Sequence, residues 1–378
     1  MNSFKQGTTV MRSLVVTLVL AGLAACAGPE RPKPAPLAPN VPLISVRPVW
    51  NAEIGVVDFP LDVRVVDGRT YLAGGAGVVA AVDAQTGADV WRANVGAPLS
   101  AGVGTDGRFS AVVTRTNELV VLDNGKVTWR QRLKALTLTA PLVAGARVFT
   151  LSTDRTVSAF DAASGQRLWQ QTKSGEALVL GQGGLLTAVG DTLLVGYGGR
   201  VAGLSPANGA SRWETAVVSP RGTNEVERLV DIVSGYSREG NQICVRSFQY
   251  AVACVDGSTG RLAWSKPASG ATGVTGDASV VIGSEGDGKL SAWKRLDGDK
   301  LWTLERYRFR VLSAPALAGR SFVVGDDSGN LHFLSKDDGA PLNRVSTDAS
   351  GIAVSPVLSG KTLVVVSRRG SIYAFRSE

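Results

Sequence analysis

Short segments of alternating apolar and polar residues recur along most of the chain and predict β-strands. Examples are Val78–Asp83, Val157–Asp161 and Leu290–Trp293. Alternation places every second side chain on the same face of a strand, so each segment is expected to bury one face. Stretches of the type Asp-x-x-Ser/Thr-Gly follow several of these segments. They predict tight turns, because aspartate binds its own backbone and glycine accepts a positive φ. The pattern as a whole indicates an all-β protein.

A glycine followed four residues later by a tryptophan recurs just after the alternating segments. The pairs are Gly87–Trp91, Gly125–Trp129, Gly165–Trp169, Gly209–Trp213, Gly260–Trp264 and Gly298–Trp302. A seventh copy at Gly339 has Asn343 in place of the tryptophan. Successive tryptophans are 38, 40, 44, 51 and 38 residues apart, and this period is typical of one four-stranded propeller blade. Recurrence at one register favours structural tryptophans packed between blades over a ligand-binding role.

The two ends of the repeat region together predict an eighth blade. Residues 371–375 have the pattern of an inner strand with no outer strand after it, and residues 44–50 that of an outer strand with no inner strand before it. Pairing of these two segments completes a blade and leaves only short, protected strand edges. The predicted fold is therefore an eight-bladed β-propeller over residues 44–378, closed by pairing of the N- and C-terminal strands.

Residues 1–25 have the pattern of an export signal. Lys5 and Arg12 precede an apolar run over residues 14–20, which is too short for a permanent membrane span. Translation is compatible with a start at Met1 or at Met11, since residues 11–14 themselves form a compact signal start.

The signal closes on Leu-Ala-Ala-Cys at residues 23–26, which resembles the processing site of bacterial lipoproteins. In such proteins the cysteine, here Cys26, is acylated, and several acyl chains anchor a protein far more firmly than one. The alternative is an ordinary secreted protein with an incidental cysteine. Ala27 stands where an aspartate would resemble an inner-membrane retention signal, so the outer membrane is favoured.

Residues 26–43 are expected to form the lipidated cysteine and a proline-rich tether. Six prolines among residues 27–43 block helix and sheet hydrogen bonding and favour a semi-rigid, extended chain. The expected role of this tether is to hold the folded body away from the membrane.

The formal net charge is +8, and the basic residues are scattered except for Arg306, Arg308 and Arg310. Tyr307 and Phe309 interleave with these arginines, as they would in a nucleic-acid site. The same alternation is typical of an exposed strand, and an exported protein does not ordinarily meet nucleic acid. We therefore expect no nucleic-acid binding.

Two cysteines remain inside the predicted propeller, Cys244 and Cys254. If the chain turns at Gln249, the two cysteines face each other across a hairpin, where β-carbons approach to about 4.5–5.5 Å. An oxidising periplasm favours a disulfide between them, and two buried thiols are the alternative. A zinc site is not expected, because the single histidine, His332, is far away in the sequence.

The residues offer little for catalysis. His332 lies in a predicted inner strand, where a packed or surface imidazole is expected rather than a general base. The chain has no Gly-x-Ser-x-Gly elbow and no phosphate-binding loop. Residues 326–330 lack the spaced carboxylates of a calcium loop and predict a hairpin turn. We therefore expect no enzyme activity, no metal and no cofactor.

The repeat Ala-x-Asp-x-x-Thr-Gly-x-x-x-Trp, as at Ala81–Trp91, resembles the blade repeat of quinoprotein alcohol dehydrogenases. A lipoprotein site ahead of a bare eight-bladed ring resembles the BamB family of outer membrane protein assembly factors. This second resemblance covers nearly the whole chain. It implies a lipid-anchored scaffold on the periplasmic face of the outer membrane that binds BamA and assists the folding and insertion of outer membrane proteins.

The resemblance also suggests where such a partner would bind. The longest interval between repeats contains Glu225, Glu227, Arg228 and Asp231, which resemble a charged family segment near the surface that contacts BamA. Insertions in repeats often form loops on a binding face. The alternative is a longer loop without a binding role.

A second candidate partner segment contains Leu178 and Leu180, which match a leucine pair of the family. Gly181 stands where the family has arginine, and this departure weakens the expectation of a charged contact. The leucines are equally compatible with a strand core.

Two other functions remain open from the sequence. A quinone-dependent dehydrogenase would share the repeat, but the adjacent cysteine pair, the length and the calcium-plus-quinone ligand set associated with those enzymes are absent. A propeller scaffold of another envelope complex is the second alternative. The resemblance also admits unfolded outer membrane proteins as direct clients, held by pairing of their strands with blade edges.

Overall fold

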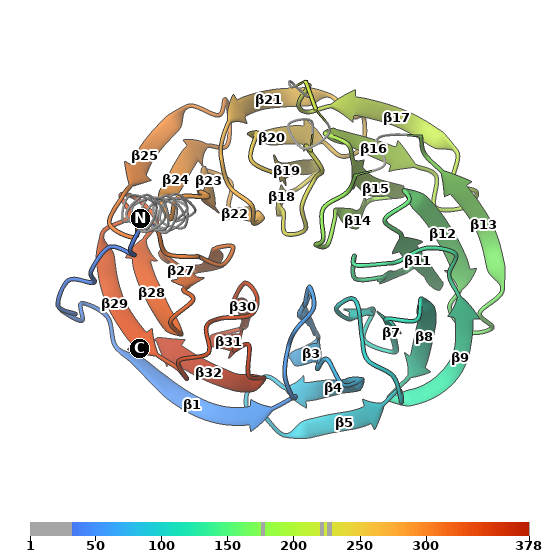
Figure 1. Cartoon of the computed structure of the whole chain (residues 1–378), viewed down its shortest axis with the longest axis horizontal. Coiled ribbons are helices and arrows are strands. Elements are labelled where there is room, and N and C mark those ends of the chain that lie inside the picture. Colours follow the sequence, from blue (N-terminus) through green and yellow to red (C-terminus); the bar gives the residue numbers. More distant parts are fainter. Residues whose placement is uncertain (1–31, 175–177, 220–222, 225–228, 378) are drawn as a thin grey trace, which may run out of the picture.

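The computed structural model describes residues 32–174, 178–219, 223–224 and 229–377. These residues form eight antiparallel sheets of four strands each, arranged as blades around a central axis (Figure 1). Strands are the only long regular elements in these ranges, and none of these residues belongs to a helix able to cross a membrane. The predicted eight-bladed β-propeller is confirmed.

Blades are numbered here along the chain. Blade 1 contains β2 (Arg64–Val66), β3 (Arg69–Ala73), β4 (Val78–Asp83) and β5 (Asp89–Asn94). Blade 2 contains β6 (Gly104–Thr105), β7 (Phe109–Val113), β8 (Glu118–Asp123) and β9 (Lys126–Arg132). Blade 3 contains β10 (Leu142–Ala144), β11 (Arg147–Leu151), β12 (Thr156–Asp161) and β13 (Arg167–Thr172). Blade 4 contains β14 (Leu186–Val189), β15 (Thr192–Tyr197), β16 (Arg200–Leu204) and β17 (Ser211–Ala216).

The second half of the ring repeats this order. Blade 5 contains β18 (Ser237–Glu239), β19 (Gln242–Ser247), β20 (Ala251–Asp256) and β21 (Leu262–Pro267). Blade 6 contains β22 (Val274–Gly276), β23 (Val280–Ser284), β24 (Leu290–Lys294) and β25 (Lys300–Leu304). Blade 7 contains β26 (Ala316–Ala318), β27 (Ser321–Gly325), β28 (Asn330–Ser335) and β29 (Pro341–Ser346). Blade 8 contains β30 (Val357–Ser359), β31 (Thr362–Val366), β32 (Ser371–Ser377) and β1 (Val46–Glu53).

The hydrophobic pattern explains why inner and outer strands differ. The two middle strands of a blade, such as β3 and β4, are buried on both faces because a neighbouring blade packs on each side. The fourth strand, such as β5, alternates between exposed and half-buried residues, because it lies at the rim of the ring. Each core cluster therefore combines side chains of two adjacent blades, as in the cluster of Val121 in blade 2 with Phe160 in blade 3.

The repeated tryptophans join neighbouring blades. Trp129 of blade 2 covers the turn of blade 3 that contains Gly165, and its Nε1 donates a hydrogen bond of 2.8 Å to the carbonyl of Ala162. A β-carbon on Gly165 would lie 2.6 Å from the Trp129 ring, and the φ of this residue is +74°. Glycine is therefore required at this position for both backbone and space. The structural role predicted for the tryptophans is confirmed.

Blade 8 is assembled from both ends of the described chain. The strand β1 pairs antiparallel with β32, from Val46 opposite Ser377 to Glu53 opposite Ser371. In Figure 1 the blue β1 lies along the red β32 at the rim of the ring. The predicted closure is confirmed, although β1 begins two residues later and ends three residues later than the predicted segment, and β32 ends two residues later.

The missing tryptophan of the seventh repeat follows from this closure. In blade 8 no turn connects β32 to β1, so Asn343 has no glycine turn to cover. The residues that precede β1 occupy the corresponding space. The Nδ2 of Asn343 donates a hydrogen bond of 2.9 Å to the carbonyl of Ile44, and its Oδ1 accepts one of 3.1 Å from Asn40. A hydrogen-bonding side chain thus replaces an aromatic one where the partner is an extended backbone.

Residues 32–43, which the sequence analysis assigned to the tether, lie against blade 7. The backbone amide of Ala35 donates to the carbonyl of Arg308 at 2.9 Å, and the guanidinium of Arg310 donates to the carbonyl of Ala35 at 2.9 and 3.2 Å. Leu37 packs on the core cluster of blades 6 and 7. An extended, proline-rich chain leaves carbonyl oxygens unpaired, and Arg310 provides the donors for that of Ala35. The described part of this segment is therefore a strap on the propeller and not a free spacer.

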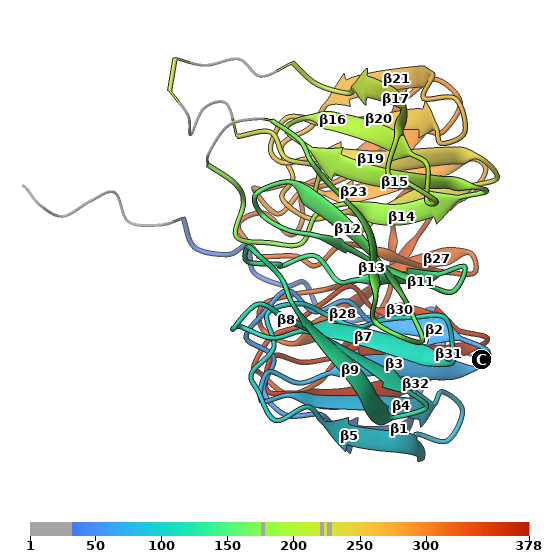
Figure 2. The same ribbon diagram turned by 90° about the vertical axis from the view of Figure 1, so that its right-hand side faces the viewer.

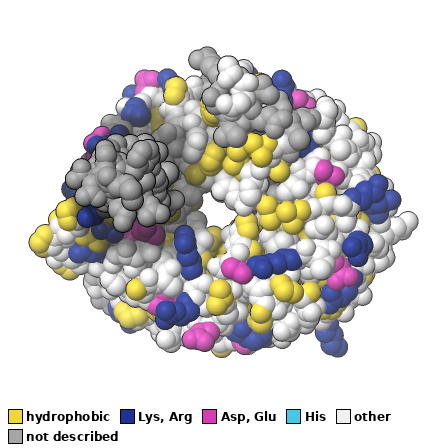
Figure 3. Space-filling view, viewed as in Figure 1, with side chains coloured by type: hydrophobic (Ala, Val, Ile, Leu, Met, Phe, Trp, Pro, Cys, Tyr) yellow, Lys and Arg dark blue, Asp and Glu magenta, His cyan; other side chains and the backbone are white. Residues whose placement is uncertain are grey.

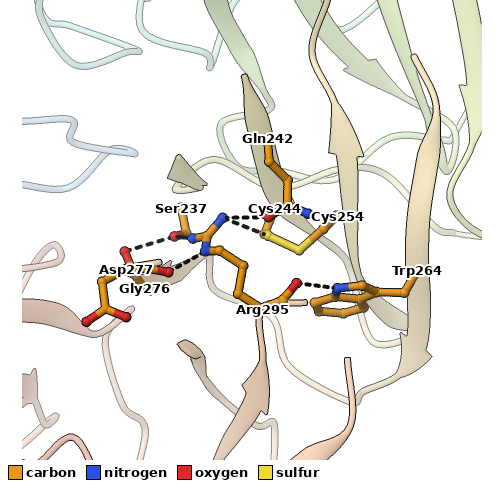
Figure 4. The surroundings of a disulfide bond; sticks show 8 residues. All are labelled: Ser237, Gln242, Cys244, Cys254, Trp264, Gly276, Asp277 and Arg295. Atoms are coloured by element: carbon orange, nitrogen blue, oxygen red, sulfur yellow. Dashed lines mark hydrogen bonds between the residues drawn. A yellow bond between two sulfur atoms is a disulfide. The ribbon is translucent and has the colours of Figure 1, made fainter. Parts of the chain in front are cut away.

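The hairpin of β19 and β20 has the register expected from its two cysteines. Gln249, with a φ of +55°, lies at the turn, and Cys244 is directly opposite Cys254. The two residues form a disulfide in the structure (Figure 4). The guanidinium of Arg295, which is 3% exposed, lies 3.3 Å from the Sγ of Cys244 and also donates to the carbonyl of Asp277. The bond is therefore sealed in the core between blades 5 and 6.

Candidate functional site

Loops of blades 3, 4 and 5 meet on one face of the ring and bring together part of the predicted partner site. Leu178 and Leu180 lie in the connection from β13 to β14, and Asp231 lies in the connection from β17 to β18. The described parts of both connections lie on the same side of the ring in Figure 2. Glu225, Glu227 and Arg228, as well as Cys26, lie outside the described residues.

Asp231 organises this meeting point through both of its carboxylate oxygens. Its Oδ1 accepts a hydrogen bond of 2.9 Å from the amide of Gly198, and its Oδ2 accepts one of 3.3 Å from the amide of Leu180. Its own carbonyl accepts a hydrogen bond of 2.9 Å from the amide of Phe248 in blade 5. Asp231 therefore links blades 4 and 5 and sets the position of Leu180, so it acts on the loop and not as an unpaired charge.

Leu180 lines an open, largely apolar hollow, and Leu178 is next in the chain to the lining residue Val179. Leu178 is 36% exposed, and Leu136 of the connection between blades 2 and 3 is 42% exposed. Leu138, Leu180 and Ile232 line the hollow itself. Figure 3 shows hydrophobic side chains gathered on this face beside the opening of the ring. Exposed apolar side chains grouped in this way are typical of a protein-binding surface.

Arg155 is a residue of this hollow that the sequence analysis did not identify. It lies in the turn from β11 to β12 with a φ of +63°, and only 8% of it is exposed. Its Nε has no hydrogen-bond partner among the described residues. Arg155 provides a guanidinium in the hollow from blade 3. Its signal in the sequence was weak, because a turn arginine in one repeat is not distinctive.

A polar network borders the hollow at blade 4. The hydroxyl of Tyr197 donates a hydrogen bond to Glu214, which also pairs with Arg200 at 3.3 Å and with Lys173 at 3.7 Å. Burial raises the pKa of Tyr197 well above its ordinary value, and the nearby Glu214 carboxylate raises it further. Tyr197 is therefore a neutral donor at physiological pH, and the network holds the end of β15 in place.

The single histidine is packed in the core, as one of the two sequence interpretations has it. His332 is 2% exposed, its Nε2 lies 3.0 Å from the Oδ2 of Asp326, and its ring centroid lies 4.4 Å from that of Tyr307. Burial alone would raise the pKa of Asp326, but hydrogen bonds from His332 and Asn330 outweigh it and hold that pKa below its ordinary value. This cluster supports blade 7. Across the described ranges, no group of three or more histidine, cysteine, aspartate or glutamate residues is arranged to hold a metal ion.

Similarity to known proteins extends over the whole chain. The family described as "Outer membrane protein assembly factor BamB" matches residues 75–304 and 297–378. The outer membrane protein assembly factor BamB of Burkholderia pseudomallei is 35% identical over 380 residues, covering 100% of both chains. The corresponding protein of Bordetella pertussis is 32% identical and covers 95% of this chain and 96% of its own.

Solved structures show the same relationship. The crystal structure of BamB from Moraxella catarrhalis has a TM-score of 0.79 and 25% identity, covering 88% of this chain and all of that one. Quinohemoprotein alcohol dehydrogenase from Comamonas testosteroni has a TM-score of 0.66 at 14% identity, which shows a common fold alone. The chain belongs to the BamB family of outer membrane protein assembly factors.

Proposed function

We propose that this protein is a non-catalytic scaffold that acts in outer membrane protein assembly and binds BamA through the hollow of blades 3 to 5. Membership of a family of assembly factors supports the process. A lipoprotein processing sequence at residues 23–26 supports anchoring of the protein through Cys26 to the periplasmic face of the outer membrane. The bare propeller, with buried histidine and paired carboxylates, supports a binding role over chemistry.

The observation that carries the partner site is a leucine pair at the hollow, in which Leu178 is exposed and Leu180 is half-buried with its backbone held by Asp231. Asp231 anchors the backbone of Leu180, and Leu178 is exposed two residues earlier. A pre-positioned apolar side chain binds with a smaller loss of conformational entropy than a mobile one. Burial of one leucine side chain in an interface contributes about 1.5–3 kcal/mol. Two such leucines beside an arginine form a small hot spot of the kind that dominates protein interfaces.

The double variant Leu178→Ala, Leu180→Ala tests this site. We expect its affinity for the periplasmic domains of BamA to fall at least tenfold in isothermal titration calorimetry, while its circular dichroism spectrum is unchanged. The matched control is Leu296→Ala, Leu301→Ala, which removes two exposed leucines of blade 6 that are 86% and 45% exposed. Equal affinities for the two variants would place the BamA site elsewhere on the propeller.

Asp231→Ala tests how the loop is held. Because Asp231 acts through the backbone of Leu180, its loss is expected to weaken BamA binding about as much as the loss of Leu180 itself. The combination of Asp231→Ala with Leu180→Ala should then add little, since both changes remove one interaction. Full additivity in such a double-mutant cycle would instead assign Asp231 a direct contact of its own.

Cys26→Ser tests the anchor. Without the thiol no diacylglyceryl group can be attached, and the protein is expected to move from the membrane fraction to the soluble periplasmic fraction. Mass spectrometry of the wild-type protein should show the mass of the acyl groups on the peptide that begins at residue 26. An unmodified peptide would contradict lipidation.

A further inference from the structure

The loop from β25 to β26 contains the arginine-rich stretch that the function above leaves unused. Residues 305–311 run along the same face of the ring as the start of the described chain. Arg306 and Arg308 are exposed, whereas Arg310 turns inward and pairs with Asp326 at 3.4 Å. Only two of the three arginines therefore point to solvent, so the stretch does not form one continuous strand of charges.

Apolar side chains project from the same loop. Phe309 is 40% exposed and Val311 is 60% exposed. Phe309 has a φ of +64°, a conformation that side chains other than glycine, asparagine and aspartate rarely adopt. Its amide donates a hydrogen bond of 2.7 Å to the carbonyl of Asp287, and the guanidinium of Arg308 lies 5.0 Å from the centre of its ring. The fold thus holds an aromatic ring at the surface beside a cation.

On residues 305–311 the two exposed cations, Arg306 and Arg308, outnumber the single exposed carboxylate, Glu305. Glu305 pairs with Lys289 at 3.3 Å and with Arg308 at 3.8 Å, so it neutralises only part of the loop. Arg306 adds a further exposed cation on the loop, and Lys33 adds one on the strap. We call residues 305–311 together with Lys33 the basic aromatic patch.

The strap places the start of the described chain at this patch. Ala35 exchanges backbone and side-chain hydrogen bonds with Arg308 and Arg310. Cys26 precedes Ala35 by nine residues, and a fully extended chain of nine residues spans about 30 Å at most. An acyl group on Cys26 would therefore keep the patch close to the membrane surface. Because the strap is docked, the ring presents this part of blades 6 and 7 to the membrane first.

We propose that the basic aromatic patch binds the anionic phospholipid headgroups of the membrane that holds the anchor. The proposal rests on the lipidation of Cys26 proposed above for the location of the membrane, but the binding itself requires only the folded ring. Cations attract the headgroup phosphates, and an exposed ring between them can enter the interface, a combination that is typical of peripheral membrane contacts. Acyl chain and patch together would set the orientation of the propeller as well as its location.

This contact has a consequence for the partner site. The described parts of the loops that contain Leu180 and Asp231 lie on the same side of the ring as the start of the described chain (Figure 2). A propeller that rests on the patch would therefore turn its apolar hollow toward the membrane side and not toward the interior of the periplasm. The hollow would then be held in one orientation relative to the membrane when it binds its partner.

Vesicle binding by the protein without its acyl group tests the patch. Residues 27–378, which contain every described residue, are exported behind a cleavable signal that leaves no lipidated cysteine. Their binding to vesicles of phosphatidylcholine with about 30% phosphatidylglycerol is measured by co-sedimentation. We expect binding that disappears on vesicles of phosphatidylcholine alone and weakens strongly in about 0.5 M salt, because the attraction is electrostatic.

The double variant Arg306→Glu, Arg308→Glu should bind these vesicles at least tenfold more weakly. The control Arg320→Glu, Lys361→Glu has the same change in net charge, with both residues exposed in turns of blades 7 and 8. Arg320 follows β26, whereas the patch precedes it, so the two lie at opposite ends of that strand. The control is expected to lose less than twofold. Equal losses in the two variants would overturn the proposal, as would undiminished binding of Arg306→Glu, Arg308→Glu.

Phe309→Asn isolates the aromatic contribution without disturbing the backbone, because asparagine tolerates a positive φ. We expect about threefold weaker vesicle binding at an unchanged melting temperature, and wild-type binding would remove the ring from the proposal. Mass spectrometry of the peptide that begins at residue 26 tests the anchor separately. If that peptide is unmodified but residues 27–378 bind anionic vesicles, lipidation fails and the patch stands. Acylation of Cys26 without binding of residues 27–378 to anionic vesicles would instead support the anchor and overturn the patch.

Discussion

The junction of blades 2 and 3 and the junction of blades 7 and 8 solve the same packing problem with different chemistry. At the first, Trp129 covers the glycine turn in the five-residue connection between the consecutive strands β12 and β13. At the second, blade 8 takes its outer strand from β1, and Asn343 binds an extended backbone at Ile44. An aromatic ring can pack on a glycine turn, whereas the side-chain amide of Asn343 can donate a hydrogen bond to a backbone carbonyl. The rim of the closing junction is therefore a polar seam, beside a core that is hydrophobic like those of the other junctions.

The largest expected effect is at the hydrophobic junction. Trp129→Ala should lower the free energy of unfolding by about 2–3 kcal/mol, because a partly buried indole and its hydrogen bond to Ala162 are lost. Urea denaturation followed by circular dichroism measures the change. Asn343→Ala at the polar seam should cost about 1 kcal/mol. A larger loss for Asn343→Ala than for Trp129→Ala would reverse the comparison.

Restoring the repeat residue at the seam is expected to be harmful. Asn343→Trp should lower the free energy of unfolding by about 2 kcal/mol, since the strap residues fill the space and no glycine turn is present to receive the ring. The melting temperature in differential scanning calorimetry measures this loss. An increase in stability would mean that the tryptophan ring displaces residues 32–43. In that case packing against these residues would not explain the asparagine at position 343.

The seam is also expected to respond to acid through Asp348. This residue accepts hydrogen bonds from Ser367 at 2.7 Å and from Tyr373 of β32 at 3.3 Å. Burial would raise the pKa of Asp348, but hydrogen bonds from Ser350 and Ser367 outweigh it and lower the pKa from 3.8 to about 2. Because the folded-state pKa is depressed, the stabilisation is complete above the unfolded value and is lost as the pH falls from about 4 to about 2.

Asp348→Asn measures this contribution directly. Allowing for screening by solvent, the carboxylate should add roughly 1–2 kcal/mol to the free energy of unfolding at neutral pH. The difference between wild type and variant should shrink as the pH falls through that window in a series of urea titrations. A difference that is constant with pH would assign the effect to the shape of the side chain and not to its charge.

The smallest expected effect is at the strap itself. Asn40→Ala removes the hydrogen bond to Asn343 at an exposed site and should cost about 0.5 kcal/mol. Hydrogen–deuterium exchange of residues 32–43 is the more sensitive measurement, and faster exchange in the variant is expected there alone. Rapid exchange of these residues already in the wild type would contradict a docked strap.

Several features of the site were predictable only in part. The sequence indicated Leu180 and Asp231 separately, 51 residues apart, but not that the carboxylate of one holds the amide of the other. It gave no reason to single out Arg155, because the loops of three blades that form the hollow are distant in sequence. The arginine-rich stretch was visible in the sequence, but which of its side chains are exposed was not. Only the structure turns Arg310 inward and leaves Arg308 and Phe309 exposed.

The sequence by itself determined the blade number, the closure of the ring and the register of Cys244 with Cys254. These depend on the two-residue alternation of strands and on a repeat of fixed length, which are local and periodic properties. Tertiary structure alone decided that residues 32–43 dock on blade 7 and that Asn343 is their partner. Such contacts join chain segments some 300 residues apart through single hydrogen bonds, and no periodic pattern records a contact that occurs once.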